Sequence, residues 1–378
     1  MIKILIAGDY APSTRVENMI EEENYSEIFD DILQYTSQSD YSVVNLEAPV
    51  VNSICAKPIQ KSGPNICCSV KALNAIKYAG FDMLTLANNH FYDYGEIGVS
   101  DTLKACKSLN LEYVGGGECY ESAALTLYKE LKDLKFAFIN CCENEFSIAT
   151  KSTGGSNPMN PVQQYYAIQE AKKRSDYVIL IVHGGPERYE YPTPRMKELY
   201  RFFIDAGADV VINHHQHRYS GFEIYHEKPI FYGLGNFCFD IESKSKTRWN
   251  TGYMVMLKFD KRQISYDCIP YVQGWQMPGV KILNESDKVE FDLDVLKINE
   301  VIADDSQLQL KYQDFVNNMS DMYLISLEPY SSRLLKSARY KHIIPSTLSK
   351  ERAINILNYI SCESHLDRMR IILSEICK

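Results

Sequence analysis

Three histidines, His214, His215 and His217, stand within four consecutive positions directly after the β-branched run Val210–Ile212. Such a run is typical of a buried strand, because β-branched apolar side chains suit a sheet that is covered on both faces. In an extended or tightly turned backbone, side chains two residues apart point the same way, so we expect His215 and His217 to converge on one point. Neutral imidazole is a common metal ligand near pH 7. A polar loop with solvated histidines is the alternative, but three of the chain's eight histidines in one short segment favour a metal site.

Further side chains with oxygen or nitrogen ligand atoms follow other predicted strands. These are Asp9 after strand 3–7, Glu47 at the end of strand 41–47, Asn89 and His90 after strand 82–87, and His183 after strand 176–182. Ligands of open α/β sheets bind beyond the carboxyl ends of the strands. For each residue alone, a turn or a helix cap is the better explanation. A series of strands that carry such residues at the same end favours a single site.

The chemistry of this set is that of a metal centre. Oxygen and imidazole ligands without thiolate suit Mn, Fe or Zn. Two carboxylates with several histidines are sufficient for two divalent metal ions bridged by one carboxylate. Such a pair lowers the pKa of a bridging water and stabilises the attacking and leaving oxygens of a displacement. His90 would then act as a general acid near the leaving group.

The elements that must position these residues alternate between strand and helix over the first two hundred residues. Apolar periodicity predicts helices over 16–35, 69–79, 97–109, 162–174 and 194–206. Strands over 229–232, 253–259 and 263–269 have no helices between them, so we expect antiparallel pairing there. The glycines at 115–117 indicate a turn and not a phosphate-binding loop, and segment 144–161 is predicted to be a mobile loop bordering the site. Together these elements predict a mixed α/β sandwich with polar residues gathered at one sheet edge.

Composition excludes some classes of protein. A net charge of −9 and a pI near 5.5 argue against a nucleic-acid partner, which needs a basic face. The eleven cysteines are odd in number and form no C-x-x-C pair, so we expect them to be reduced. The opening MIKILIAGDY predicts a strand rather than a signal peptide, and no apolar run reaches the ~18 residues of a membrane span. We therefore expect a cytoplasmic protein with no membrane span.

Several motifs together resemble the CapA family, which is associated with capsule or poly-γ-glutamate synthesis and is related to the calcineurin-like metallophosphoesterases. In chain order these motifs are GDYAP, VVNLEAPV, LANNHFYDYG, VHGGPE, FIDAGADVVINHHQH and KPIFYGLGNFCFD. The resemblance covers residues 1–275 and implies a metallophosphatase-like double β-sandwich flanked by helices (αββα). It also implies a set of metal-binding positions, with His90 beside the leaving group. The matching residues are Asp9, Glu47, Asn89, His183, His215 and His217.

The sequence departs from the family pattern in places. Ordinary metallophosphoesterases begin with Asp-x-His, but Asp9 is followed by Tyr10 and Ala11, so one metal ligand is missing, as it is in CapA-like sequences. The family's Gly-His-His-Pro-His is 213–217 here, with asparagine first and glutamine fourth. Its His-Trp-Gly is His183-Gly184-Gly185, so the bulk of the tryptophan is absent.

Three arginines follow the motifs closely and could bind an anionic substrate: Arg15, Arg188 and Arg218. The planar guanidinium binds carboxylate or phosphate through two parallel hydrogen bonds. Surface pairing with nearby acids is the alternative. We expect at least two of the three to converge on the mouth of the metal site.

Residues 276–378 lie outside the resemblance and are predicted to be mostly helical. Segment 304–327 has a helical pattern, and Ser349 and Ser364 are predicted N-caps of two amphipathic helices. Their apolar stripes are most simply core, while a homodimer or partner contact through these C-terminal helices is the alternative.

Two functions follow from this set of residues. The first is a metal-dependent hydrolase acting on a phosphoester, or on an anionic capsule-type polymer such as poly-γ-glutamate, with metal-activated water as nucleophile. The second is a non-catalytic capsule-pathway component that binds an acidic polymer or a synthase. The ligand set favours the hydrolase, because buried charged ligands are costly to retain without a metal.

Overall fold

The computed structural model describes residues 1–241, 247–261, 263–330, 332–361, 365–366, 369 and 372–373. The chain forms two compact units, Met1–Gln309 and Leu310–Lys378. Every residue nominated for the site lies in the first unit. The second unit contains most of α9 (Asp305–Ser326), together with α10 (Arg333–Tyr340) and α11 (Lys350–Ser361).

The first unit extends beyond residue 275, where the family resemblance ends. Helix α8 (Glu285–Ala303) belongs to it because Phe291 packs its ring against Tyr219 and Tyr253, at centroid distances of 5.0 and 5.6 Å. Lys197 adds a salt bridge to Asp305, with 2.6 Å between Nζ and Oδ1. Residues 276–309 are therefore part of the same folded body as the candidate site.

An eight-stranded sheet forms one layer of this unit. Its order is β16-β15-β14-β1-β2-β3-β4, and β13 pairs with the end of β1. Strands β1 to β4 are parallel, whereas β14, β15 and β16 are antiparallel. The antiparallel pairing expected between strands 253–259 and 263–269 is confirmed, but the expected strand 229–232 lies in the other sheet as β12, where it pairs in parallel with β10 and antiparallel with β11. The strands are β1 Ile2–Tyr10, β2 Tyr41–Leu46, β3 Met83–Thr85, β4 Glu112–Val114, β13 Asn236–Cys238, β14 Thr251–Phe259, β15 Ile264–Gln273 and β16 Val280–Ile282.

A six-stranded sheet forms the second layer, in the order β11-β12-β10-β9-β7-β6. Its four central strands are parallel, and β6 and β11 close the edges in antiparallel pairing. A small ladder joins β5 (Gly116–Gly117) to β8 (Gly155–Ser156). The strands of the second layer are β6 Leu127–Leu131, β7 Leu134–Cys142, β9 Tyr177–His183, β10 Val210–His214, β11 Phe222–Tyr225 and β12 Lys228–Phe231.

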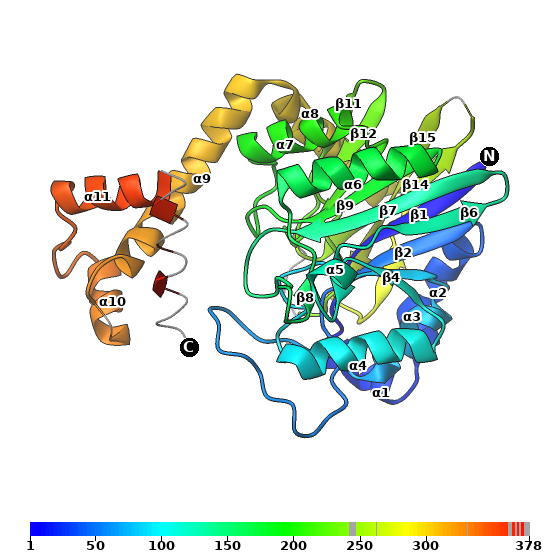
Figure 1. Ribbon diagram of the computed structural model, residues 1–378, viewed down its shortest axis with the longest axis horizontal. Coiled ribbons are helices and arrows are strands. Elements are labelled where there is room, and N and C mark those ends of the chain that lie inside the picture. Colours follow the sequence, from blue (N-terminus) through cyan, green and yellow to red (C-terminus); the bar gives the residue numbers. More distant parts are fainter. Residues whose placement is uncertain are drawn as a thin grey trace. The chain divides into compact units, whose positions relative to one another are not determined.

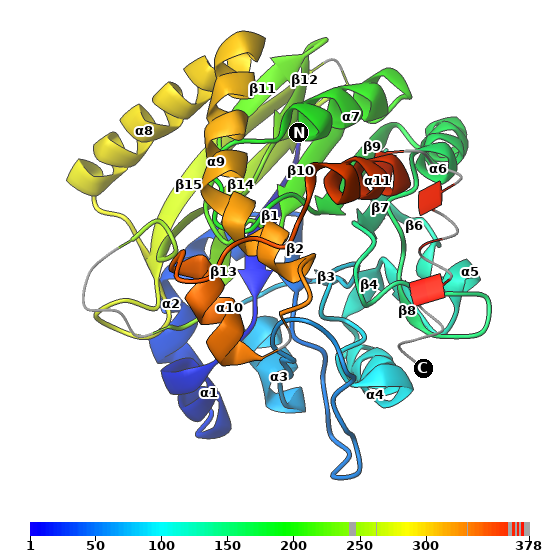
Figure 2. The same ribbon diagram turned by 90° about the vertical axis from the view of Figure 1, so that its left-hand side faces the viewer.

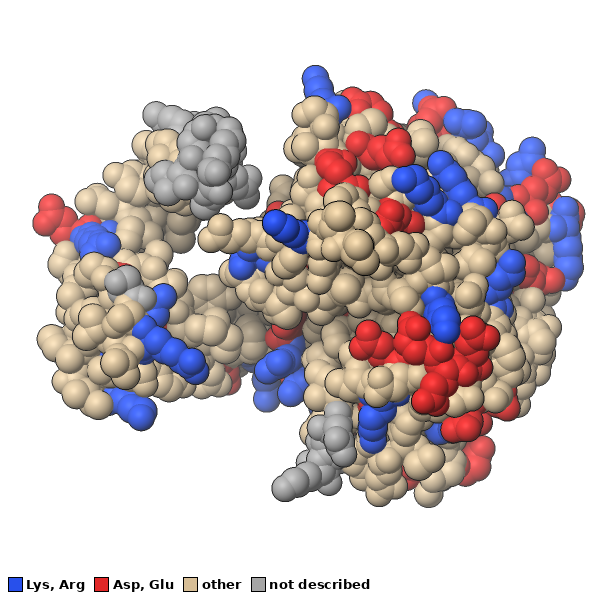
Figure 3. Space-filling view, turned by 90° about the horizontal axis from the view of Figure 1, so that it is seen from below, with Lys and Arg blue, Asp and Glu red and all other residues tan. Residues whose placement is uncertain are grey.

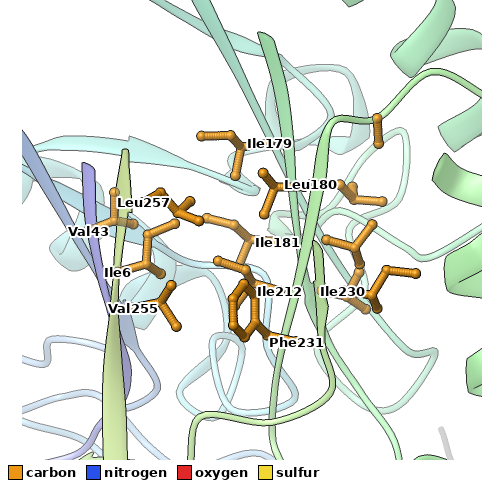
Figure 4. Packing of buried hydrophobic residues seen from close by; sticks show 14 of the residues in the cluster. Ile6, Val43, Ile179, Leu180, Ile181, Ile212, Ile230, Phe231, Val255 and Leu257 are labelled. Atoms are coloured by element: carbon orange, nitrogen blue, oxygen red, sulfur yellow. The ribbon is translucent and has the colours of Figure 1, made fainter. Parts of the chain in front are cut away.

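The two sheets pack face to face through apolar side chains. Figure 4 shows Ile6 and Val255 of one sheet opposite Ile181, Ile212 and Phe231 of the other, and all five are fully buried. Because side chains alternate along a strand, every second residue of each strand enters this layer. Full burial of one such aliphatic side chain stabilises the fold by about 1.5–3 kcal/mol.

Helices cover both outer faces, which completes an αββα sandwich and confirms the predicted architecture. Figure 1 shows α6 and α7 on one side of the strands and α1 to α4 on the other. The outer face of the eight-stranded sheet packs Leu5 and Val44 against Ile28, Leu73 and Ile76 of the helices. The helices of the first unit not yet given are α1 Thr14–Glu21, α2 Tyr25–Thr36, α3 Val70–Tyr78, α4 Gly95–Ser108, α5 Tyr120–Ala123, α6 Pro161–Arg174 and α7 Pro194–Asp205.

Two predictions about helices need comment. The single helix expected over 16–35 is wrong, because Glu23 has a φ of 62° and ends α1 before α2 begins. The N-cap at Ser349 is confirmed, since Arg352 N donates to Ser349 Oγ at 3.2 Å. The N-cap at Ser364 lies outside the described residues.

The surface carries both signs of charge. Figure 3 shows groups of acidic side chains with Lys and Arg side chains between them, in line with the net charge of −9. Among the described residues, no helix is both long and apolar enough to cross a membrane.

Candidate metal centre

Two groups of buried ligand atoms lie side by side in the first unit. One consists of Glu47, His183 and His215, and the other of Asp9, Glu47 and His217. Within each group the ligand atoms lie within 4.8 Å of one another. Glu47 belongs to both groups, so its carboxylate is shared between them.

The groups are assembled from both sheets. Asp9 lies in β1 and Glu47 directly follows β2, both in the eight-stranded sheet. His183 ends β9, and His215 and His217 follow β10, both in the six-stranded sheet. The expectation of a single sheet edge is therefore wrong, because the carboxyl ends of parallel strands from two facing sheets meet at the same place.

The turn after β10 separates its two candidate ligands. His215 and His217 have φ values of 93° and 55°, a left-handed conformation that costs on the order of 1–3 kcal/mol for residues other than glycine. Their ring centroids are 6.1 Å apart, and each ring joins a different group. The expectation that both converge on one point is wrong, since it assumed an extended or simply turned backbone.

Asp9 is held by groups from both sheets. Its Oδ1 accepts a hydrogen bond from Asn45 Nδ2 at 2.7 Å, and its Oδ2 accepts one from His215 N at 3.1 Å. The preceding Gly8 allows a close backbone approach, as predicted, because a Cβ there would lie 1.9 Å from Gly235 O. The carboxylate is thus fixed before any ligand binds.

The polar atoms left unpaired inside the centre fit a metal. Both carboxylate oxygens of Glu47 and Nδ1 of His215 are buried without a hydrogen-bond partner among the described residues. Both ring nitrogens of His214 are also unpaired there, but His214 belongs to neither group. A buried, unpaired carboxylate costs several kcal/mol unless a cation compensates it. Carboxylate and imidazole donors are those that Mn, Fe and Zn accept. The residues present therefore suit divalent transition metal ions.

Burial sets the protonation of these groups. It raises the pKa of Glu47 well above its usual value, and the neighbouring charge of Asp9 adds to this shift. Burial also lowers the pKa of His183 well below its usual range and that of His215 to about 3. Both rings are therefore neutral near pH 7, the form in which imidazole binds metals.

Asn89 and His90 lie beside the first group. Asn89 Oδ1 is 3.1 Å from His183 Nε2, so the amide lies beside that group. His90 Nδ1 is 2.7 Å from Asp93 Oδ2, so the ring can donate its Nδ1 proton to a buried carboxylate. A ring that is oriented through Nδ1 keeps Nε2 for proton transfer to a substrate.

Sequence reasoning missed residues that support the ligands. Asn45 lies in β2, two positions before Glu47, and this spacing in an extended chain could have identified it. Asp93 follows His90 by three positions, within reach of its ring. Asn236 Oδ1 lies 2.9 Å from His217 Nδ1, but its distance in the sequence left no local signal.

The glycines at 115–117 support the turn that carries Asn89. They lie at and beside β5, which pairs with β8 from segment 144–161. A Cβ on Gly115 would lie 2.0 Å from Asn140 Oδ1, the atom that accepts a hydrogen bond from Ala87 N. Position 115 therefore requires glycine, because any side chain there would collide with Asn140 beneath the turn. The prediction of a simple turn over 115–117 did not include this packing requirement.

The arginines nominated for substrate binding have different surroundings. Arg15 binds Asp240, with 2.6 Å between NH2 and Oδ1, and Arg218 NH1 lies 3.8 Å from Glu190 Oε2. Asp240 therefore balances the charge of Arg15, whereas Glu190 is shared between Arg218 and Arg248, whose Nη1 lies 3.4 Å from Glu190 Oε1. Arg188 is exposed, and its backbone N donates to Gln216 O at 2.8 Å. Their role in substrate binding stays a prediction.

An acidic side chain also lies at the centre. Glu145 Oε1 is 3.8 Å from His215 Nε2, and the carboxyl contacts the Asn89 side chain. Burial raises the pKa of Glu145 above its usual value, although the Asn89 hydrogen bond opposes that shift. Segment 144–161 therefore does border the site.

Fold and site together define an αββα protein with a candidate two-ion centre at the facing strand ends. Residues 3–241 match the family model of the bacterial capsule synthesis protein PGA_cap, and the chain belongs to this family. The resemblance to CapA proteins is thereby confirmed.

Curated relatives agree with this assignment. The capsule biosynthesis protein CapA of Bacillus anthracis is 35% identical over 247 residues, which cover 63% of this chain and 60% of that protein. The PGA biosynthesis protein CapA of Bacillus subtilis strain 168 is 33% identical over 237 residues, covering 62% of each. The chain thus matches about three fifths of the length of these relatives.

Solved structures with a related arrangement include a phosphatase from Mycoplasma pneumoniae, at a TM-score of 0.46 and 16% identity over 73% of this chain and 95% of that one. A 5'-nucleotidase from Candida albicans aligns at a TM-score of 0.41 and 10% identity, over 84% of this chain and 57% of that one. Both scores are below 0.5, so we take the fold from the strand order above and not from these alignments.

Proposed function

We propose that this protein is a metal-dependent hydrolase of the CapA and metallophosphoesterase type. Its substrate would be a phosphoester or an anionic capsule-type polymer such as poly-γ-glutamate. The observation that carries the proposal is the position of Glu47. Its carboxylate is fully buried, has no hydrogen-bond partner among the described residues, and is shared by two groups of histidine and carboxylate ligands.

The residues have separate tasks. Asp9, Glu47 and His217 would hold one ion, and Glu47, Asn89, His183 and His215 the other. Two divalent ions bound there would lower the pKa of a coordinated water and stabilise the oxygens of a displacement. His90 would protonate the leaving group from Nε2, since Asp93 holds its Nδ1.

The substrate class follows from the relatives and from the local charges. Relatives carry names from capsule and PGA biosynthesis, which favours an anionic polymer. Asp240 already balances Arg15, and Arg218 lies near Glu190. Attraction of an anionic group would therefore depend mainly on the bound cations, which are often the largest charges in a metal site.

A hydrolysis screen tests the proposal. Purified protein loaded with Mn, Fe or Zn would be assayed on phosphodiesters, phosphomonoesters and γ-glutamyl peptides. We expect hydrolysis of at least one class, abolished by Glu47→Gln. A protein that binds metal but leaves all three classes intact would contradict the proposal.

The alternative is a non-catalytic component that binds a capsule-type polymer or a synthase. Ala11 favours it, because this buried alanine stands where Asp-x-His supplies a ligand and offers no donor atom. The group around Asp9 therefore has three protein ligands in the described chain. Metal-dependent binding of poly-γ-glutamate without turnover would support this alternative.

A further inference from the structure

The irregular segment 51–69 between β2 and α3 is fastened to the turn that carries His90. In Figure 2 this segment is the blue arm that reaches down between α3 and α4. Ile59 N donates to Asp93 O at 2.9 Å, and Asn65 Nδ2 donates to the same oxygen at 3.1 Å. Ile66 N donates to Asp93 Oδ2 at 2.8 Å. Asp93 is thus the point at which this segment meets the site.

A lysine from the same segment is buried against this aspartate. The Lys61 side chain is 2% exposed and the Asp93 side chain 0%, and Lys61 Nζ forms an ion pair with Asp93 Oδ1. The same Nζ lies 3.2 Å from His90 Nδ1. A lysine in a surface segment normally keeps its ammonium in water, because burial of an unpaired charge is costly. Lys57, four residues earlier, is exposed.

We propose that Lys61 is a positioning residue for His90, acting through Asp93. This inference rests on the proposed role of His90 as general acid. It assigns segment 51–69 a part in the reaction, because that segment supplies the cation on which the orientation of the His90 ring depends.

The contacts around Asp93 explain how Lys61 would act. Oδ2 receives His90 Nδ1 at 2.7 Å and Ile66 N at 2.8 Å, while Oδ1 pairs with Lys61. With both oxygens engaged, the carboxylate cannot rotate about its bond to Cβ without breaking a contact. Loss of the Lys61 ammonium would leave Asp93 Oδ1 buried and unpaired. The Asp93 carboxylate would then shift, and the His90 ring would no longer be held in the orientation that points Nε2 toward the substrate.

Kinetics separate this role from a purely structural one. Lys61→Met keeps an unbranched apolar side chain but removes the charge, Lys61→Arg keeps the charge, and exposed Lys57→Met is the matched control on the same segment. With glycerophosphocholine as substrate, a phosphodiester whose alkoxide leaving group needs a proton, Lys61→Met should lower kcat by about 10- to 100-fold, the range expected for a misplaced catalytic group. KM and metal content should stay within twofold of wild type, Lys61→Arg should recover most of the loss, and Lys57→Met should behave as wild type.

A double-mutant cycle tests the route through Asp93. If Lys61 acts through this carboxylate, Lys61→Met combined with Asp93→Asn should lose no more activity than Asp93→Asn alone. Additive losses would overturn the proposal. So would a Lys61→Met protein with unchanged kcat, or one whose metal content and fold are lost and are not restored by Lys61→Arg.

A second measurement does not depend on turnover. In protein labelled with ¹⁵N-histidine and loaded with Zn, the Nδ1 proton of His90, assigned by its absence in His90→Asn, should be visible in wild type and in Lys57→Met. Lys61→Met should weaken that signal through faster exchange with water. If wild type hydrolyses nothing, the proposed function fails while this spectrum still decides the role of Lys61. An unchanged His90 signal in Lys61→Met would overturn that role.

Discussion

Glu47 is the residue on which the two-ion arrangement depends. Its two oxygens are buried without a hydrogen-bond donor in the described part of the chain, and burial together with Asp9 raises the pKa of its carboxyl. A carboxyl in this setting binds a proton or a cation. Metal and proton therefore compete at this residue, and metal affinity should fall as the pH is lowered.

Substitution of single ligands should remove ions selectively. His183→Ala and His215→Ala should each lose the ion of the first group, and His217→Ala the ion of the second, while Glu47→Gln should lose both. The fold should persist, because loss of a ligand lowers site affinity more than core burial. Elemental analysis measures the ions and circular dichroism the fold. Purified wild type without metal after growth with Mn, Fe and Zn would contradict the two-ion assignment.

His90 should behave differently from the ligands. His90→Ala should keep its metal content but lose on the order of 10²–10⁴-fold in kcat, the usual contribution of a general acid. The comparison uses elemental analysis and initial rates on the same preparations. A His90→Ala protein that turns over at the wild-type rate would rule out the proton-transfer role.

At the scale of elements, Arg15 at the start of α1 links that helix to the segment after β13. Arg15 Nε and NH2 donate to both oxygens of Asp240, and NH2 also donates to Trp275 O. Burial alone would raise the pKa of Asp240, but hydrogen bonds from Arg15 and Thr14 outweigh it and hold that pKa below its usual value. This contact therefore serves the packing of α1.

The sign of this shift gives a pH-dependent prediction. A carboxyl whose pKa is lower in the folded state adds stability above its unfolded pKa of 3.8, and this contribution is lost as the pH falls through the folded value. Arg15→Met should reduce the free energy of unfolding by about 1.5–3 kcal/mol near pH 7, and the difference should shrink below about pH 4. Urea titrations at pH 7 and pH 3 measure it, with exposed Arg188→Met as control. An equal loss at both pH values would show that packing, not charge, is responsible.

At the scale of the molecule, bound metal should stabilise the first unit. Ions that bind only the folded state add about 2.7 kcal/mol at a free concentration of 100 times Kd. Treatment with a chelator should therefore lower Tm in calorimetry, and Mn or Zn should restore it. His215→Ala should show a smaller response to the chelator than wild type. A wild-type Tm that the chelator leaves unchanged would argue against a metal in the folded protein.

The second unit exposes apolar side chains that a monomer rarely leaves in water. Leu334 is 84% exposed, Ile343 70% and Ile360 60%. Self-association would cover such residues. We predict a homodimer by light scattering, converted to monomer by Leu334→Asp with Ile360→Asp, with unchanged metal content because the site lies in the first unit. A monomeric wild type would leave partner binding as the alternative.

The sequence predicted the five side chains that the structure groups together, and the strands that carry them. Each of these side chains lies at or just beyond the end of a strand whose apolar pattern is local, and the αββα layers follow from the alternation of strands and helices. The division of the candidate ligands into two groups that share Glu47 depends on tertiary packing. That Asp9 and Glu47 face His183 from a different sheet depends on non-local packing, and the left-handed turn at His215 and His217 depends on contacts around it. The burial of Lys61 against Asp93 was equally unpredictable from the sequence, because residues 32 positions apart meet only when an irregular segment folds back onto the site.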